Sequence, residues 1–254
     1  MRNDNKKVIG KPCTIVQVQG KLYGLGIGPG DPKLLTIRAK EILDSADVVF
    51  VPKAKDDGIS HARAIVAGAT SKKKKFIELT FLMTSDRDKL KSCWLGAAER
   101  IAKELKGKRT AAFVTLGDPF IYSTYIYLLE TLRDNFPGIA VETVPGITSF
   151  NAAAASCGLP LLKGHEKLAI LPVTGNFNDL RPTLKTFDTV VLMKIGSKLD
   201  KVIGLLKKMR LVKNSVLVSH AGTASEKIIR DLSSIKDERL GYLSVVIVRR
   251  KTGE

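Results

Sequence analysis

The stretch Leu22-Tyr-Gly-Leu-Gly-Ile-Gly-Pro-Gly-Asp-Pro-Lys-Leu-Leu-Thr36 decides the fold class of this chain. A short apolar run with strand character stops at Gly28-Pro29-Gly30-Asp31, and an amphipathic segment follows at once. In α/β proteins, a strand followed by a glycine-rich turn and a helix commonly forms part of a ligand-binding site. Glycine suits this turn because its backbone can approach a ligand closely.

The familiar nucleotide loops do not fit this turn. A dinucleotide-binding loop that began at Gly26 would need its third glycine where Asp31 stands. A phosphate-binding P-loop would need Gly-Lys-Ser or Gly-Lys-Thr afterwards, and neither follows. The turn therefore predicts a ligand site of another kind.

Length and composition allow one large α/β domain or two smaller ones. The chain has 254 residues, 44% of them hydrophobic, and strand-like and helix-like runs alternate along it. No apolar run approaches the roughly 20 residues that a membrane span needs. Residues 1–7 lack the apolar core of a signal peptide, so we expect a cytoplasmic protein with no membrane partner.

The residues that most often bind metals are few and dispersed. They are Cys13, Cys93, Cys157, His61, His165 and His220. This spacing gives neither a disulfide framework nor a Cys-x-x-Cys site, so we expect no metal site.

A net charge of +17 allows three kinds of partner: nucleic acid, an anionic surface, or a polyanionic small substrate. Much of the excess is scattered in runs such as 72–75 and 207–208, which a solvated basic surface would also explain. No zinc-finger spacing or aromatic-basic RNA-binding pattern is present. Charge alone does not choose among the partners.

Periodicity predicts two α/β halves, with domains at 21–138 and 139–254 and an N-terminal extension over 1–20. Strands are expected at 21–27, 48–51, 75–80, 110–116, 139–144, 168–173, 189–195, 215–220 and 243–249. Helices are expected at 31–47, 58–70, 86–106, 121–136, 151–156, 180–187, 197–209 and 225–232.

Loops with turn residues follow five of these strands, at 28–31, 117–119, 145–149, 193–194 and 220–222. One such loop is explained by turn chemistry alone, because Gly, Pro and Asp populate turns anyway. Ligands of open parallel sheets bind outside the carboxyl ends of the strands. Five endings of this kind in one chain therefore indicate a ligand site.

Taken in order, these motifs resemble the tetrapyrrole methyltransferases, which use S-adenosylmethionine. The matching segments are Gly-Pro-Gly-Asp-Pro at 28–32, Leu-Gly-Asp-Pro at 116–119, Pro-Gly-Ile-Thr-Ser at 145–149, Met193, and Ala-Gly-Thr at 221–223. Further segments at 51–53, 115–119, 121–124 and 149–154 are similar to the subgroup that methylates C20 of precorrin-2 or cobalt-factor II in cobalamin synthesis. The resemblance covers about residues 21–250.

The resemblance implies a two-domain α/β fold, a homodimer, and a cofactor cleft between the domains. By the family's pattern the cofactor, or its product S-adenosylhomocysteine, contacts Pro29, Leu116, Gly117, Asp118, Ile121, Thr148, Ser149, Met193, Ala221 and Gly222. Asp118 could accept hydrogen bonds from the ribose or the amino group. Thr148 and Ser149 offer hydroxyls and a helix-start amide for the carboxylate, and Met193 offers a soft apolar contact for adenine.

The chain departs from one group of this family in the residues that follow its second predicted strand. Uroporphyrinogen-III methyltransferases carry an acidic residue shortly after the second strand, where this chain has Val51-Pro52-Lys53. No acidic catalytic residue can therefore be transferred there. Tyr122 and Tyr125 are the candidates for substrate contact, although helix packing would explain at least one of them.

The proposed substrate carries eight carboxylates, so a basic trough would steer and hold it. Lys53, Arg63 and Lys194 are candidates for that trough because they follow strand ends or lie near them. Whether the substrate contains cobalt stays open. Two alternatives also stay open: methylation at another tetrapyrrole position, and a basic RNA-binding module whose glycine turns are only structural.

Overall fold

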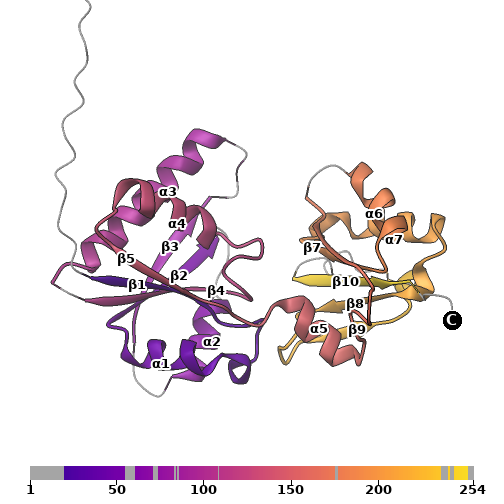
Figure 1. The fold of residues 1–254 in the computed structure, drawn as a ribbon, viewed down its shortest axis with the longest axis horizontal. Helices are drawn as coiled ribbons and strands as arrows, with labels where there is room; N and C mark the ends of the chain where they lie inside the picture. The colour runs from indigo at the N-terminus through magenta and orange to yellow at the C-terminus, as the bar shows by residue number, and fades with distance from the viewer. Residues whose placement is uncertain are drawn as a thin grey trace, which may run out of the picture.

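The computed structural model describes residues 20–54, 61–70, 74–82, 84, 86–107, 109–174, 177–235, 240 and 243–250. These residues form two α/β domains, each built on a five-stranded sheet (Figure 1). The N-terminal extension predicted over residues 1–20 lies outside the described residues, except for Gly20. Within the described ranges, no helix combines the length and apolarity needed to cross a membrane.

The first sheet is entirely parallel, with strand order β3-β2-β4-β1-β5. Its strands are β1 (Lys21–Gly26), β2 (Val48–Ala54), β3 (Lys75–Phe81), β4 (Thr110–Thr115) and β5 (Ala140–Val144). Val48 to Val51 are buried on both faces of the sheet, which explains their unbroken apolar sequence. Helices cover both faces, as all-parallel sheets require.

Two apolar layers sandwich this first sheet. The helices α3 (Arg87–Glu104) and α4 (Tyr125–Asn135) pack on one face. The helices α1 (Ile37–Ser45) and α2 (His61–Ala69) pack on the other (Figure 1).

The second sheet is mixed, with order β6-β7-β10-β8-β9. Its strands are β6 (Leu168–Pro172), β7 (Thr189–Met193), β8 (Ser215–Ser219), β9 (Lys227–Ile229) and β10 (Ser244–Arg249). Only β6 and β7 pair in parallel, while β10 runs antiparallel to both of its neighbours. The helix α5 (Ser149–Cys157) packs on one face, and α6 (Leu180–Thr186) and α7 (Leu199–Lys208) pack on the other.

The predicted α/β class with two domains is confirmed, but the boundary at 138/139 is wrong. The strand β5 pairs in parallel with β1, from Lys21↔Ala140 to Leu25↔Val144. The first sheet therefore continues to Val144, and the predicted cut would remove its edge strand. A parallel partner far away in the sequence leaves no local signal.

Three predicted helices also differ. The helix expected at 31–47 is a 3-10 turn, Pro32–Leu34, followed by α1, because Thr36 Oγ1 accepts from Ala39 N and starts the helix there. The helix expected at 121–136 begins only at Tyr125, since Tyr122 has a φ of 51°. The helix expected at 225–232 contains β9 instead, which adds an edge strand to β8.

Candidate active site

Three glycines bring the carboxyl ends of β1, β4 and β5 into backbone contact. Gly117 N donates to Gly28 O at 2.8 Å. A Cβ placed on Gly146 would lie 2.2 Å from Gly117 O, and one on Gly26 would lie 2.6 Å from Gly146 N. No side chain fits on Gly26 or Gly146 at these distances, and Gly117 has a φ of 69°, which residues other than glycine rarely adopt. Gly26, Gly117 and Gly146 are named here the glycine junction.

Asp118 links the loop after β4 to the loop after β5 by hydrogen bonds. Its Oδ2 accepts from Gly146 N at 3.0 Å, and its Oδ1 accepts from Phe120 N at 2.9 Å. Each carboxylate oxygen of Asp118 therefore already accepts a hydrogen bond from a backbone amide. The predicted contact between Asp118 and a cofactor stays a prediction, and the structure adds a positioning role that sequence reasoning missed.

The N-terminus of α5 faces the glycine junction. Thr148 caps this helix, with its Oγ1 accepting from Asn151 N at 3.3 Å. A Cβ placed on Gly117 would be in van der Waals contact with this helix start, 3.9 Å from Ser149 N and from Thr148 Cα. The amides of a first helical turn attract anions.

The second domain completes the site with the loop after β8. A Cβ on Gly222 would lie 3.1 Å from Pro29 Cγ, and one on Gly30 would lie 2.3 Å from Thr223 Cγ2. The Gly-Pro-Gly turn after β1 is thus packed directly against the second domain. Of the residues predicted to contact a cofactor, Pro29 and Gly222 lie on the two sides of this contact.

An apolar wall joins both domains beside this contact. Ala221 is buried in the same cluster that Ile121, Met193 and Leu34 pack against. Leu116, by contrast, packs into the core of the first domain. The predicted cofactor residues Ile121, Met193 and Ala221 therefore lie together although they come from both domains, whereas the side chain of Leu116 does not join them.

Three residues near the strand ends have left-handed backbones although they are not glycine. Tyr122, Lys194 and His220 have φ values of 51°, 53° and 53°, which is uncommon and typical of functional loops. Tyr122 donates its hydroxyl proton to Ile170 O at 2.9 Å and so bridges the domains, and burial raises the pKa of its hydroxyl. Desolvation lowers the pKa of Lys194.

Tyr125, the other tyrosine suggested for substrate contact, is a core residue. Its side chain is fully buried, its hydroxyl lies 2.6 Å from Thr143 Oγ1, and its ring stacks on Phe113. The same ring fills the place that a Cβ on Gly24 would need. The structure therefore contradicts a catalytic role for Tyr125, and packing explains it.

Lys53 and Arg63, which were suggested to bind the substrate, both form ion pairs with the carboxylate of Glu78. Sequence reasoning missed Glu78, although an acidic residue between the apolar residues Ile77 and Leu79 of β3 is a visible signal. Lys194 lies elsewhere, after β7, and no ion pair to it is found among the described residues.

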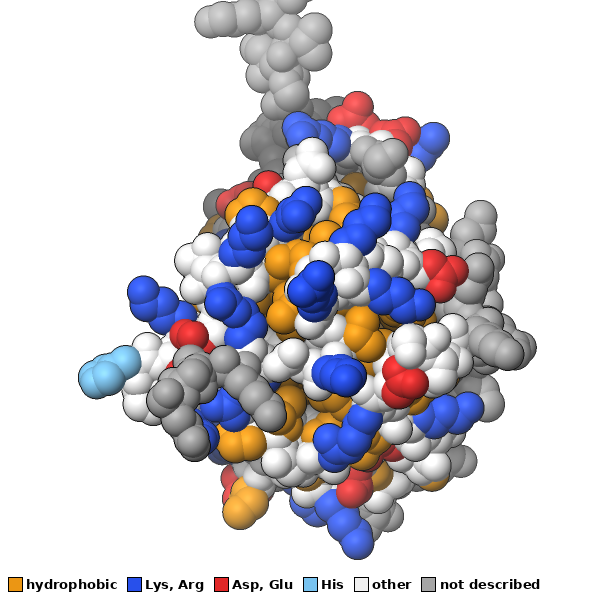
Figure 2. Space-filling model, turned by 90° about the vertical axis from the view of Figure 1, so that its right-hand side faces the viewer, with side chains coloured by type: hydrophobic (Ala, Val, Ile, Leu, Met, Phe, Trp, Pro, Cys, Tyr) orange, Lys and Arg blue, Asp and Glu red, His pale blue; other side chains and the backbone are white. Residues whose placement is uncertain are grey.

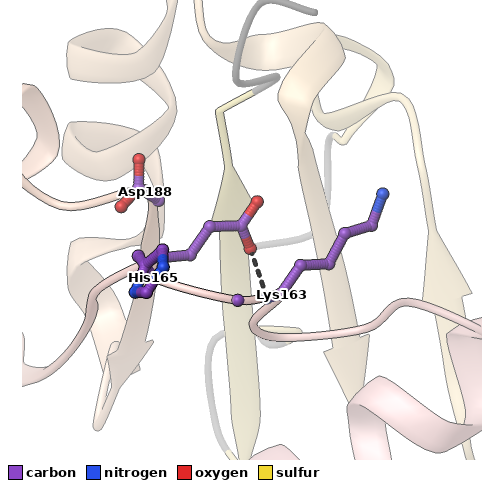
Figure 3. A pocket seen from close by; sticks show the side chains of 5 residues that line it. Lys163, His165 and Asp188 are labelled. Carbon is purple, nitrogen blue, oxygen red and sulfur yellow. Dashed lines mark hydrogen bonds between the residues drawn. The ribbon is translucent and has the colours of Figure 1, made fainter.

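A surface pocket at the start of the second sheet is not part of this site. It is lined by Lys163, Gly164, His165, Glu166 and Asp188 (Figure 3). These residues precede β6 and β7, so they lie at the opposite strand ends from Met193. Glu166 is already occupied, because its carboxylate accepts from Lys163 N at 2.7 Å and pairs with Arg249 at 2.8 Å. Within the described ranges, no group of potential metal ligands gathers anywhere.

The fold and the candidate site define a two-domain α/β protein whose strand-end loops meet where the two domains touch. The chain belongs to the tetrapyrrole (corrin/porphyrin) methylases, whose family profile matches residues 21–235. The predicted family and the predicted methyltransferase class are thereby confirmed.

Individual relatives agree with this membership. A probable cobalt-precorrin-2 C(20)-methyltransferase of Methanocaldococcus jannaschii is 38% identical, over 91% of this chain and 96% of its own. A precorrin-2 C(20)-methyltransferase of a Sinorhizobium species is 33% identical, over 90% of this chain and 95% of its own. The solved uroporphyrin-III C-methyltransferase of Thermus thermophilus, complexed with S-adenosylhomocysteine, shares the fold with a TM-score of 0.63 and 20% identity, covering 91% and 98% of the two chains.

Proposed function

We propose that this protein transfers a methyl group from S-adenosylmethionine to C20 of precorrin-2, in its metal-free or cobalt-containing form, during cobalamin biosynthesis. The observation that carries the proposal is the meeting of strand-end loops from both domains at the glycine junction and Gly222. The choice of C20 rests on relatives that bear this name and match nearly the whole chain.

The residues present fit this cofactor. S-adenosylmethionine supplies a methyl group on a positively charged sulfur. The N-terminus of α5, which lies next to Gly117, offers backbone amides for the cofactor's carboxylate. Ile121, Met193 and Ala221 offer the apolar wall for adenine. Asp118 holds the two loops in place and has lone pairs left for the cofactor's polar groups.

Placement supplies much of the proposed catalysis. A sulfonium is already an excellent leaving group, so a rigid site that aligns the methyl group with a nucleophilic carbon needs little acid–base chemistry. The backbone contacts at the glycine junction provide that rigidity. The substrate's carboxylates would bind Lys194 and the pair Lys53 and Arg63, which is consistent with the net charge of +17.

The remaining basic charge is spread rather than gathered. Figure 2 shows Lys and Arg side chains scattered over the second domain, with apolar atoms between them and few acidic groups. This distribution favours a solvated basic surface for most of the excess charge. The comparisons give no support to the RNA-binding alternative.

The proposal includes a cytoplasmic homodimer. Two exposed aromatic side chains of the first domain support an interface there, because Phe120 is 54% exposed and Tyr127 is 55% exposed. Light scattering after size exclusion would test it, with a mass of twice 27.7 kDa expected for the dimer.

The enzymatic proposal is tested by mixing purified protein with S-adenosylmethionine and either precorrin-2 or its cobalt complex. One added methyl group on either compound is expected, and the mass and metal content of the product decide which form is the substrate. Calorimetry with S-adenosylhomocysteine serves as the binding control. No binding there, together with salt-sensitive RNA binding, would favour the RNA-binding alternative instead.

A further inference from the structure

Lys53 and Arg63 meet on a single carboxylate. Lys53 Nζ lies 3.1 Å from Glu78 Oε2, and the Arg63 guanidinium lies 3.8 Å from Glu78 Oε1. The same guanidinium lies 5.2 Å from the centre of the Phe76 ring, within range of a cation–π contact. Lys53, Arg63 and Glu78 are here named the Glu78 cluster.

The three members come from different elements but share one face of the first sheet. Val51 and Glu78 are opposite each other in the parallel pairing of β2 and β3. Side chains alternate along a strand, so Lys53 lies on the same face as Val51 and Glu78. The helix α2, which carries Arg63, packs on that face. The cluster is therefore fixed by the sheet register and by helix packing.

The cluster lies beside the candidate active site. β2 is the direct neighbour of β4, and their pairing includes Phe50↔Phe113. This pairing ends at Phe50 and Phe113, and Lys53 stands three residues further along β2, near its carboxyl end. The helix α2 also packs against the turn that follows β1. The cluster therefore lies at the same edge of the first sheet as the loop after β4, outside which we place the tetrapyrrole.

Charge and exposure suit the cluster to a ligand. Its two cations and one anion leave one positive charge, which matches one carboxylate. The side chains of Lys53, Glu78 and Arg63 are 31%, 35% and 52% exposed, so a ligand can reach them. Ion pairs this exposed contribute little to folding stability. Stability of the fold therefore does not account for the arrangement.

We propose that Glu78 is a positioning residue, which holds Lys53 and Arg63 ready as one binding site for a carboxylate at the rim of the tetrapyrrole substrate. The inference rests on the proposed function, because it needs a polycarboxylate substrate. Holding two long side chains in place before binding reduces the conformational entropy that binding would cost. Glu78 also repels the incoming carboxylate, but the cluster has two cations and one anion, so its net charge still attracts a carboxylate.

The chain supplies a matched control for this arrangement. Glu104 pairs with Lys75 at 2.8 Å and with Arg109 at 3.7 Å. Lys75 begins β3 and Arg109 precedes β4, so this second cluster lies at the opposite end of the same sheet. E104Q therefore removes the same charge from the same kind of cluster, away from the site.

The test measures binding of uroporphyrin III, an unreactive tetrapyrrole with eight carboxylates, by fluorescence anisotropy. E78Q is expected to weaken binding about fivefold, which is the loss of part of one charged contact, and E104Q is expected to leave it unchanged. The double variant K53M/R63Q should bind more weakly still. Adding E78Q to that double variant should cause no further loss, because Glu78 promotes binding only through these two cations.

Binding by E78Q that equals or exceeds the wild-type affinity would overturn the inference, and so would a further loss when E78Q is added to K53M/R63Q. E78D, which keeps the charge on a shorter side chain, should restore part of the affinity, and thermal unfolding checks that each variant folds. Methyl transfer by the wild-type protein is measured alongside. Its absence counts against the proposed function, whereas normal transfer with unaltered porphyrin binding by E78Q counts against Glu78 alone.

Discussion

Asp118 shows how one carboxylate can organise a site at the scale of a residue. Because its oxygens hold Gly146 N and Phe120 N, D118A should loosen both loops without unfolding the domain cores. Charge-assisted hydrogen bonds contribute about 1.5–3 kcal/mol, so we expect S-adenosylhomocysteine to bind about tenfold more weakly or worse. Calorimetry measures this affinity. D134A on the exposed side of α4 is the control, and an unchanged affinity in D118A would remove Asp118 from the site.

Substrate binding should weaken at alkaline pH as Lys194 loses its proton. Desolvation lowers its pKa from the ordinary 10.5, so the ammonium loses its proton at a lower pH than a free lysine does. Binding a carboxylate requires the charged form, so the KM for the tetrapyrrole should rise as pH approaches 10.5 from below. Deprotonation also relieves the desolvation cost in the folded state, so this group does not destabilise the fold over the same range.

Substitution separates this loss of binding from general alkaline effects. K194R keeps its charge at every accessible pH and should flatten the KM profile, whereas K194M should show a raised KM throughout. A K194M profile that coincides with the wild-type profile would show that Lys194 does not contact the substrate.

The turns that contain Pro29, Gly117 and Gly222 could be located from the sequence, because glycine and proline after a strand mark a turn. Their contact with a cofactor stays a prediction, since turn chemistry alone explains any one of them. Tyr125 was misassigned because a tyrosine near a loop looks the same in the sequence whether its ring faces substrate or Phe113. The partner decides its role, and partners are distant in sequence.

At the scale of elements, the glycine junction should tolerate no side chain. G146A places a Cβ against Gly117 O and Gly26, so we expect it to destabilise the protein by about 1–3 kcal/mol and to abolish cofactor binding. Gly96 is exposed in α3 with nothing near its Cβ position, so G96A should instead stabilise by about 0.5–1 kcal/mol. Chemical denaturation measures both. Equal stabilities of the two variants would show that the junction can relax.

Glu142 joins three elements of the first domain. It binds Lys21 of β1 at 2.7 Å and Arg38 of α1 at 3.3 Å, and chiefly the hydrogen bond from Lys21 lowers the pKa of Glu142 from 4.5. A lowered folded-state pKa gives stability that is present above 4.5 and lost as pH falls through the folded-state value. Because the paired side chains are 35–56% exposed, the effect should be small: the melting temperature of E142Q should be slightly lower at neutral pH and fall slightly less in acid. E130Q on the exposed face of α4 is the control, and an acid profile in E142Q that parallels wild type would contradict this role.

Most helices and strands could be predicted because hydrophobic periodicity is a local property of the sequence. The errors occurred where pairing with a strand that is distant in the sequence determines the structure of a segment. The segment 227–229 has no strand signature of its own and becomes β9 because β8 offers an open edge. Similarly, Ala140–Val144 belongs to the first domain only because β1 pairs with it. The ends of a hydrophobic pattern also predict helix ends poorly. The helix α1 starts later than predicted because the hydroxyl of Thr36 caps it.

At the scale of the whole molecule, neither domain holds the candidate site alone. The first domain supplies the glycine junction, while the second supplies the loop at Ala221 and Gly222 and the apolar contact of Met193. The Tyr122 hydroxyl and the packing of Gly30 on Thr223 link the two domains at that place. We therefore expect the cofactor to bind to the intact chain, with the substrate's rim extending toward the Glu78 cluster.

The position of the new methyl group tests the central claim most directly. The protein is incubated with S-adenosylmethionine carrying a ¹³C-labelled methyl group and with precorrin-2 or its cobalt complex, and the product is examined by NMR. The account predicts one labelled methyl group, attached to C20, on at least one of the two compounds. Label at another carbon, or no transfer to either compound, would contradict it.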